Sequence, residues 1–167
     1  EGGKKINLLE INTFKTSKMS GYQPSDSVQT KMAFHTTHHE AAHILHQTIL
    51  YSPEYKSISA GMYTTNWINY TDQEALQDGF ITAYSMQDPN EDFVEMISVM
   101  LTEGKANYDR MVNNITGTSI RGITSDVAKS RLRQKESIVV NYFRTAWGID
   151  FYRLQSRVRA SVEYYIY

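Results

Sequence analysis

The chain has 167 residues, a mass of 19.2 kDa and a formal net charge of −1. This length suits one domain with a proper core, spanning residues 1–167, and is short for two. The near-neutral charge argues against nucleic acid or an anionic membrane as the main partner, and no segment approaches the roughly 18 consecutive apolar residues of a membrane span.

Cysteine is absent, which excludes a disulfide framework and a thiolate metal site. Any zinc must therefore be held by His, Asp or Glu. The chain opens at Glu1 without a Met, so we expect it to be the C-terminal part of a longer precursor.

The first part of the chain predicts a strand, a loop and a long helix. Lys5–Phe14 has apolar residues at mixed spacing and favours a strand, and Ser17–Ser27 carries the Gly, Pro and Asp of a loop that can cap the next helix. From about Gln29 to Tyr51 there is no Gly or Pro, and apolar and His residues recur at the three- and four-residue steps of an amphipathic helix. The aromatic stretch Tyr55–Tyr70 has no clear period and predicts a loop with a short strand.

The rest of the chain predicts helices with recognisable start and stop signals. They are Asp72–Asp78, closed by Gly79; a strong helical segment after the turn Asp88-Pro89-Asn90, ending at Gly104; a short helix at about Asn107–Ile115; a long helix to Ala146, capped by Ser125 and stopped by Gly148; and a last helix to Ile166, capped by Asp150. The expected fold is mainly α, with a small sheet at most.

All five histidines lie in one segment, HTTHHEAAHILHQ at 35–47, whose centre has the pattern H-E-x-x-H. On a helix His39 and His43 share one face and can offer their imidazole nitrogens to one zinc ion at about 2.0–2.1 Å. Glu40 is rotated by about 100° from His39, which places it beside a zinc-activated water as a general base. The alternative is a helix whose histidines pack and hydrogen-bond in a core.

The third ligand has to be a downstream carboxylate, or His35 on the same face. In NEDFVEMISVML, Glu91 and Glu95 are four residues apart on one helical face. In such an arrangement one carboxylate can bind a metal while the other orients a ligand histidine through its free N–H. The alternative is a pair of solvated acids at the start of a helix, where they suit the dipole.

Together, HHEAAHILHQ and GFITAYSMQDPNEDFVEM resemble the gluzincin class of metallopeptidases. They are most similar to the lethal-factor-like branch and to the zinc-binding peptidases of bacterial substrate-import lipoproteins. The resemblance runs from about Ala33 to Leu154. It implies Glu91 as the third zinc ligand, Glu95 as the residue that orients a zinc-bound histidine, and Tyr84, seven residues before Glu91, as the stabiliser of the oxyanion.

The resemblance also implies a zincin-like catalytic domain that holds Zn²⁺ and cleaves peptide or glycopeptide substrates. It further implies a lipoprotein at the outer membrane, cell surface or periplasm, with a nutrient-import complex as partner. Two alternatives stay open. One is a metallohydrolase acting on glycopeptide or another amide. The other is a catalytically silent, import-associated zinc protein whose metal is structural or whose cleft only binds a ligand.

The remaining candidate residues each have two interpretations. His35 is either a ligand or a residue at the rim of the site or behind the ligands, and His38 and His46 are expected to be surface or packing histidines. Trp67 and its neighbouring tyrosines either line a substrate cleft or belong to the core. The run RLRQK at 131–135 predicts the solvated face of a long helix.

Overall fold

The computed structural model describes residues 14–167, and this part of the chain is all helical. Its elements are α1 (Asp26–Thr48), α2 (Glu54–Ile58), η2 (Trp67–Asn69), α3 (Asp72–Asp78), η3 (Tyr84–Met86), α4 (Pro89–Asn113), α5 (Ser125–Trp147) and α6 (Phe151–Ile166). Within this range the β structure is limited to one isolated bridge, Thr118 to Thr124. The mainly α prediction is confirmed, whereas the strand expected at Lys5–Phe14 lies outside the described residues except for Phe14, which is not in a strand.

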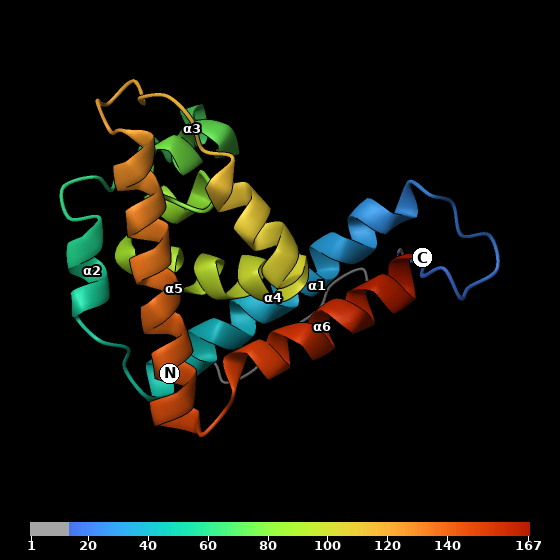
Figure 1. The fold of residues 1–167 in the computed structure, drawn as a ribbon. Helices are drawn as coiled ribbons and strands as arrows, with labels where there is room; N and C mark the ends of the chain where they lie inside the picture. The colour runs from blue at the N-terminus through green and yellow to red at the C-terminus, as the bar shows by residue number, and fades with distance from the viewer. Residues whose placement is uncertain (1–13) are drawn as a thin grey trace.

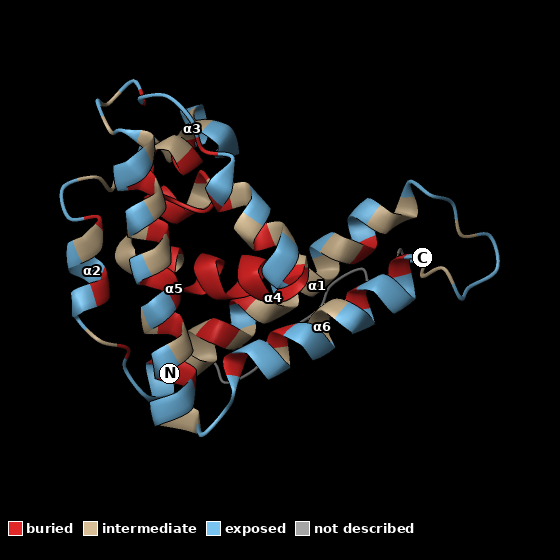
Figure 2. Ribbon diagram, in the orientation of Figure 1, coloured by how far each residue is buried: buried red, intermediate tan, exposed pale blue. Residues whose placement is uncertain are grey.

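Helix α4 forms the centre of the fold and packs against α1, α5 and α6 (Figure 1). Every residue from Asp92 to Thr102 is buried, so this stretch has no solvated face (Figure 2). A helix that is covered on all sides belongs to the interior of a protein. None of the helices in residues 14–167 is long and apolar enough to cross a membrane.

The ends of the helices follow the capping chemistry of the sequence. Thr71 and Glu74 form a capping box at the start of α3, and Gly79 ends that helix in the left-handed conformation. Asp150 caps α6 as predicted, because its side chain accepts a hydrogen bond from the Arg153 backbone N–H. The cap of α5 is Thr124, however, and Ser125 is already the first helical residue, so that prediction was wrong by one position.

Gly104 divides α4 into two helices. Its φ of 74° and ψ of 168° are non-helical, so the first helix ends there as the sequence predicted, and a second helix follows and continues to Asn113, where the sequence predicted a short helix at about Asn107–Ile115. Helix α6 packs on this kink, where Gln155 donates to the Met100 carbonyl and Arg159 to the Thr102 carbonyl. A Cβ at position 104 would lie 2.9 Å from Arg159 Cγ, so the close approach of α6 also requires glycine.

The stretch Tyr55–Tyr70 contains helical turns, not the short strand that was expected. Helix α2 carries Tyr55, which is fully buried and donates a hydrogen bond to the Asp92 carbonyl of α4. The short helix η2 carries Trp67, which is half-buried. Burial of Tyr55 against α4 and packing of Trp67 against Tyr84 therefore fix the path of this segment, and no local period encodes these contacts.

The run RLRQK is not a solvated face, because Lys135 has no exposed surface. The Lys135 ammonium lies 2.7 Å from Oδ2 of Asp92, whose side chain is also unexposed. The ammonium further donates a hydrogen bond to the Gly79 carbonyl at 2.9 Å. Tyr63 donates a further hydrogen bond to the same carboxylate oxygen. Burial raises the pKa of Asp92 and lowers that of Lys135, while their mutual attraction opposes both shifts.

Replacing Lys135 by Met should lower the free energy of unfolding by about 3–5 kcal/mol, because Asp92 is left as a buried carboxylate without its cation. Equilibrium denaturation in urea measures this change. The control Lys129→Met, a half-buried lysine on the same helix, should change stability by no more than about 0.5 kcal/mol. Equal losses in the two variants would mean that the buried pair has no special role.

Candidate metal centre

The centre forms where α1 meets α4. His39 and His43 lie one turn apart on α1, and Glu91 lies in the first turn of α4. The Asp88 side chain caps α4 by accepting hydrogen bonds from the backbone N–H groups of Asn90 and Glu91. This cap fixes the position of Glu91 opposite the two histidines.

Two imidazole nitrogens and the two oxygens of one carboxylate converge in a triangle of three groups. His39 Nε2 lies 3.2 Å from His43 Nε2 and 3.2 Å from Glu91 Oε2, and His43 Nε2 lies 3.4 Å from Glu91 Oε1. Ligand atoms at about 2.0–2.1 Å from a tetrahedral zinc ion are separated by roughly 3.3 Å. The spacing of the triangle therefore matches a zinc site with three protein ligands.

Glu91 gives a second indication that a cation fits here. Its Oε2 atom is buried, and within residues 14–167 no donor reaches it with hydrogen-bond geometry. A buried carboxylate oxygen without a partner is costly, and a bound cation would satisfy it. Two imidazole nitrogens and a carboxylate oxygen are also ligands that zinc accepts.

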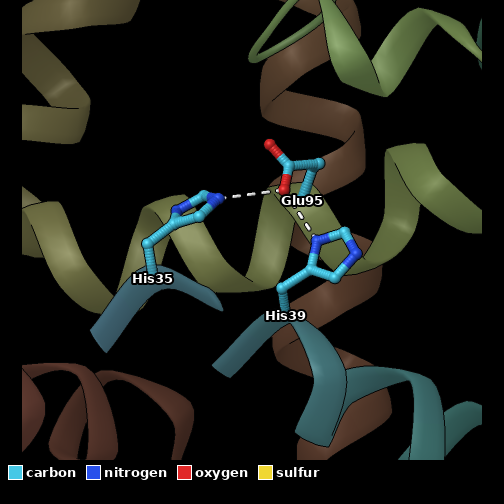
Figure 3. A group of neighbouring side chains, drawn as sticks. All are labelled: His35, His39 and Glu95. Carbon is cyan, nitrogen blue, oxygen red and sulfur yellow. Dashed lines mark hydrogen bonds and ion pairs between the residues drawn. The ribbon is translucent and has the colours of Figure 1, made fainter. Parts of the chain in front are cut away.

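Glu95 lies behind His39, on the side away from the triangle. Its Oε1 atom accepts a hydrogen bond from His39 Nδ1 at 2.7 Å, which leaves the Nε2 lone pair of His39 free for a metal (Figure 3). Burial would raise the pKa of Glu95, but hydrogen bonds from His35 and His39 outweigh it and lower that pKa to about 2. Burial likewise opposes protonation of His39, yet Glu95 and the other nearby carboxylates raise the pKa of His39.

His46 contacts the Nδ1 atom of His43, as Glu95 contacts the Nδ1 atom of His39. Its Nε2 atom is 3.2 Å from His43 Nδ1, and its ring packs near Tyr51 and Phe93. Burial lowers the pKa of His46, which favours the neutral ring. The sequence predicted a surface or packing residue, and only the three-residue spacing from His43 could have suggested this contact.

The structure places His35 and His38 outside the triangle. His35 Nε2 donates to Glu95 Oε1 at 3.0 Å, so His35 contacts the partner of a candidate ligand. His38 is half-buried, and its Nδ1 atom hydrogen-bonds to the Phe34 carbonyl within the same helix.

Two candidate catalytic residues flank the triangle. Glu40 follows His39 on α1 and is exposed. Tyr84 lies on η3 with its ring 5.8 Å from the His39 ring. Burial, reinforced by the charge of Glu91, raises the pKa of Tyr84 to about 12, so its hydroxyl keeps its proton at neutral pH. Trp67 packs edge-on against Tyr84, with the two ring centroids 4.9 Å apart.

A protein-family model described as "Putative zinc-binding metallo-peptidase" matches residues 1–152. The chain belongs to this family. A crystal structure from Bacteroides caccae with the same description is similar to this fold, with a TM-score of 0.72 and 30% sequence identity. The match covers 87% of this chain and 52% of the other, so this metallo-peptidase family member spans about half the length of that protein. None of the curated proteins matches the chain.

We expect the purified protein to bind one zinc ion per chain and Glu91→Ala to weaken zinc binding at least about 100-fold, because the variant removes one corner of the triangle. Elemental analysis gives the stoichiometry, and competition with a chelator gives the affinity. Glu103→Ala on the same helix, which loses a surface pair with Lys31 and a long contact with Asn107, serves as the control. Zinc binding that survives in Glu91→Ala as it does in Glu103→Ala would exclude Glu91 as a ligand.

Proposed function

We propose that this protein is a zinc-dependent metallopeptidase in which His39, His43 and Glu91 hold Zn²⁺ and water opens the amide bond. The observation that carries the proposal is the triangle of two imidazole nitrogens and one carboxylate at separations of 3.2 to 3.4 Å. A catalytic zinc site has three protein ligands and an open fourth position, whereas a structural site is closed by four. Membership of the peptidase family supports a peptide substrate.

The chemistry divides between the cation and the side chains around it. When bound, zinc lowers the pKa of a coordinated water towards about 7 and polarises the substrate carbonyl. The Glu40 carboxylate takes a proton from the attacking water and returns it to the leaving nitrogen. Because Glu40 is exposed and adjoins His39 in sequence, it can reach water and substrate without competing for the ligand positions.

Tyr84 is the proposed donor to the oxyanion that develops on the substrate carbonyl. Its hydroxyl is protonated at neutral pH, as that of an ordinary tyrosine is, and the raised pKa of about 12 keeps it protonated at alkaline pH as well. Its ring stands beside that of His39. A donor that is already oriented towards developing charge stabilises the transition state more than the ground state. Glu95 does not touch the substrate in this proposal, since its part is to orient His39.

The cellular setting rests on the sequence resemblance alone. On that basis we propose that the protein is lipid-anchored at the outer membrane, cell surface or periplasm. There it would act on peptides or glycopeptides beside a nutrient-import complex.

Glu40→Gln should abolish most turnover and leave zinc binding intact, because the amide cannot accept the proton of water. Loss of a general acid–base corresponds to a decrease in kcat of about 100- to 10,000-fold. The assay is cleavage of fluorogenic peptide and glycopeptide libraries beside a zinc determination, with the exposed Glu54→Gln as the control. Full activity in Glu40→Gln would assign the base elsewhere, and cleavage of no substrate by the zinc-loaded wild type would favour a ligand-binding protein.

Tyr84→Phe should lower kcat by about 100- to 1,000-fold with little change in KM, since the hydroxyl acts on the oxyanion and not on the bound substrate. The same peptide that reports on Glu40 provides the measurement. Tyr70→Phe, at a half-buried tyrosine of the apolar cluster that also contains Trp67, is the matched control. A Tyr84→Phe variant with unchanged kcat would remove this residue from the mechanism.

A further inference from the structure

Glu95 accepts hydrogen bonds from three side chains on two different segments. Its Oε1 atom accepts from His39 Nδ1 at 2.7 Å and from His35 Nε2 at 3.0 Å, and the two contacts converge on this single oxygen (Figure 3). Its Oε2 atom accepts from the Thr82 hydroxyl at 2.8 Å. Glu95 is only 2% exposed, so these donors replace water around the carboxylate.

His35 itself is firmly placed. It lies one turn before His39 on α1, and the Ser98 hydroxyl of α4 donates to its backbone carbonyl at 2.6 Å. The two imidazole rings therefore approach Glu95 from the same helix, with their centroids 6.4 Å apart. His35 is therefore a second hydrogen-bond donor to the carboxylate that accepts from His39.

Thr82 braces the other oxygen from the segment that carries Tyr84. Its hydroxyl accepts a hydrogen bond from the Ser85 backbone N–H at 3.1 Å, and the Ser85 hydroxyl donates to the Thr82 carbonyl at 2.6 Å. Glu95 is thereby tied both to α1 and to the turn that holds the proposed oxyanion donor. A carboxylate fixed at both oxygens cannot rotate away from His39.

We propose that His35 is a positioning residue of the metal centre. His35 fixes the Glu95 carboxylate by a hydrogen bond, and Glu95 in turn orients the His39 imidazole. The inference rests on the proposed zinc site but not on the reaction that the site performs. The hydrogen bond from His35 restricts rotation of the Glu95 carboxylate and stabilises the ionised carboxylate. Glu95 is thereby held where it accepts a hydrogen bond from His39 Nδ1. The geometry of His39 Nε2 in the triangle follows from that contact.

A second cation between His35, His39 and Glu95 is the competing interpretation, because their ligand atoms also lie close together. The distances argue against it. The two nitrogen–oxygen separations, 2.7 and 3.0 Å, are those of hydrogen bonds and end on one oxygen, whereas the atoms of the triangle stand 3.2 to 3.4 Å apart. An ion among these three groups would also have to displace the protons that join them.

The test uses the whole 167-residue chain and the variants His35→Ala and His35→Gln. Alanine removes the donor, and the glutamine amide nitrogen can reach the place of the His35 Nε2 atom. Thr82→Val removes a donor to the same carboxylate from a different segment, so the idea remains testable if His35→Ala does not fold. His38→Ala changes a half-buried histidine of α1 whose hydrogen bond, among the described residues, stays within its own helix, and it is the matched control.

Four readouts are taken for each protein: zinc stoichiometry, the zinc dissociation constant from chelator competition, the visible absorption of the cobalt-substituted form, and thermal unfolding of the metal-free form. We expect one zinc per wild-type chain, a loss of affinity of about 10- to 100-fold in His35→Ala with a shifted cobalt spectrum, and a similar loss in Thr82→Val. His35→Gln should recover affinity to within about threefold of the wild type. Thermal unfolding of the metal-free proteins should be cooperative in every variant, with a modest loss of stability in His35→Ala and Thr82→Val because the buried Glu95 carboxylate loses a donor, so the zinc affinities are compared between folded proteins.

Three outcomes would overturn the inference. Unchanged zinc affinity in His35→Ala would mean that Glu95 needs no second brace, and equal losses in His35→Ala and His38→Ala would indicate a general effect on α1. Two zinc ions per wild-type chain, with one lost in His35→Ala, would establish the second cation site instead. Peptide cleavage does not enter this test, so a wild type that binds zinc and cleaves nothing contradicts the proposed peptidase and leaves the positioning role to be judged on affinity alone.

Discussion

The hydrogen bond from His39 to Glu95 joins the two helices that make the site. It connects residues 56 positions apart in the chain and lies at the contact between α1 and α4. Glu95 can accept it as a buried carboxylate because His35 and Thr82 supply the remaining donors. The triangle of candidate ligands depends on this contact, since it sets which imidazole nitrogen of His39 faces Glu91.

The position of Glu91 depends in turn on its neighbours in α4. On its N-terminal side the Asp88 cap fixes the first turn, and on its C-terminal side Asp92 is held by the buried ammonium of Lys135 and the hydroxyl of Tyr63. Adjacent helical residues point about 100° apart. Anchoring Asp92 in the core therefore turns Glu91 towards α1. The buried ion pair, costly on its own, sets the rotation of the helix that supplies the third candidate ligand.

The sequence predicted the parts of the fold that local chemistry encodes. Helix α1 follows from a run without Gly or Pro, α3 from a capping box and a terminal glycine, and α6 from the Asp150 cap. Four of the predicted site residues needed only helical spacing to be paired, His39 with His43 and Glu91 with Glu95, and the structure brings both pairs to one contact between helices. Tyr84 could be singled out only through the resemblance to a known family.

The features that the sequence could not predict depend on tertiary contacts. A lysine in a helix is normally solvated, and only the packing of α5 on α4 reveals that Lys135 meets Asp92 in the core. For His35 the sequence offered a place behind the ligands as one interpretation, but the contacts of His35 and His46 could not be predicted, because spacing places them on the histidine face and does not say which groups lie opposite. The packing of α6 on the break at Gly104 was not predicted either, because no local signal shows that α6 side chains satisfy the carbonyls that the kink frees.

A crystal structure of the zinc-loaded protein, with anomalous data collected at the zinc edge, would identify the ligands of the metal directly. We predict one anomalous peak at about 2.0–2.1 Å from His39 Nε2, His43 Nε2 and a Glu91 oxygen, with no fourth protein ligand. A peak bound by His35 and Glu95, or a site closed by four side chains, would contradict the three-ligand centre.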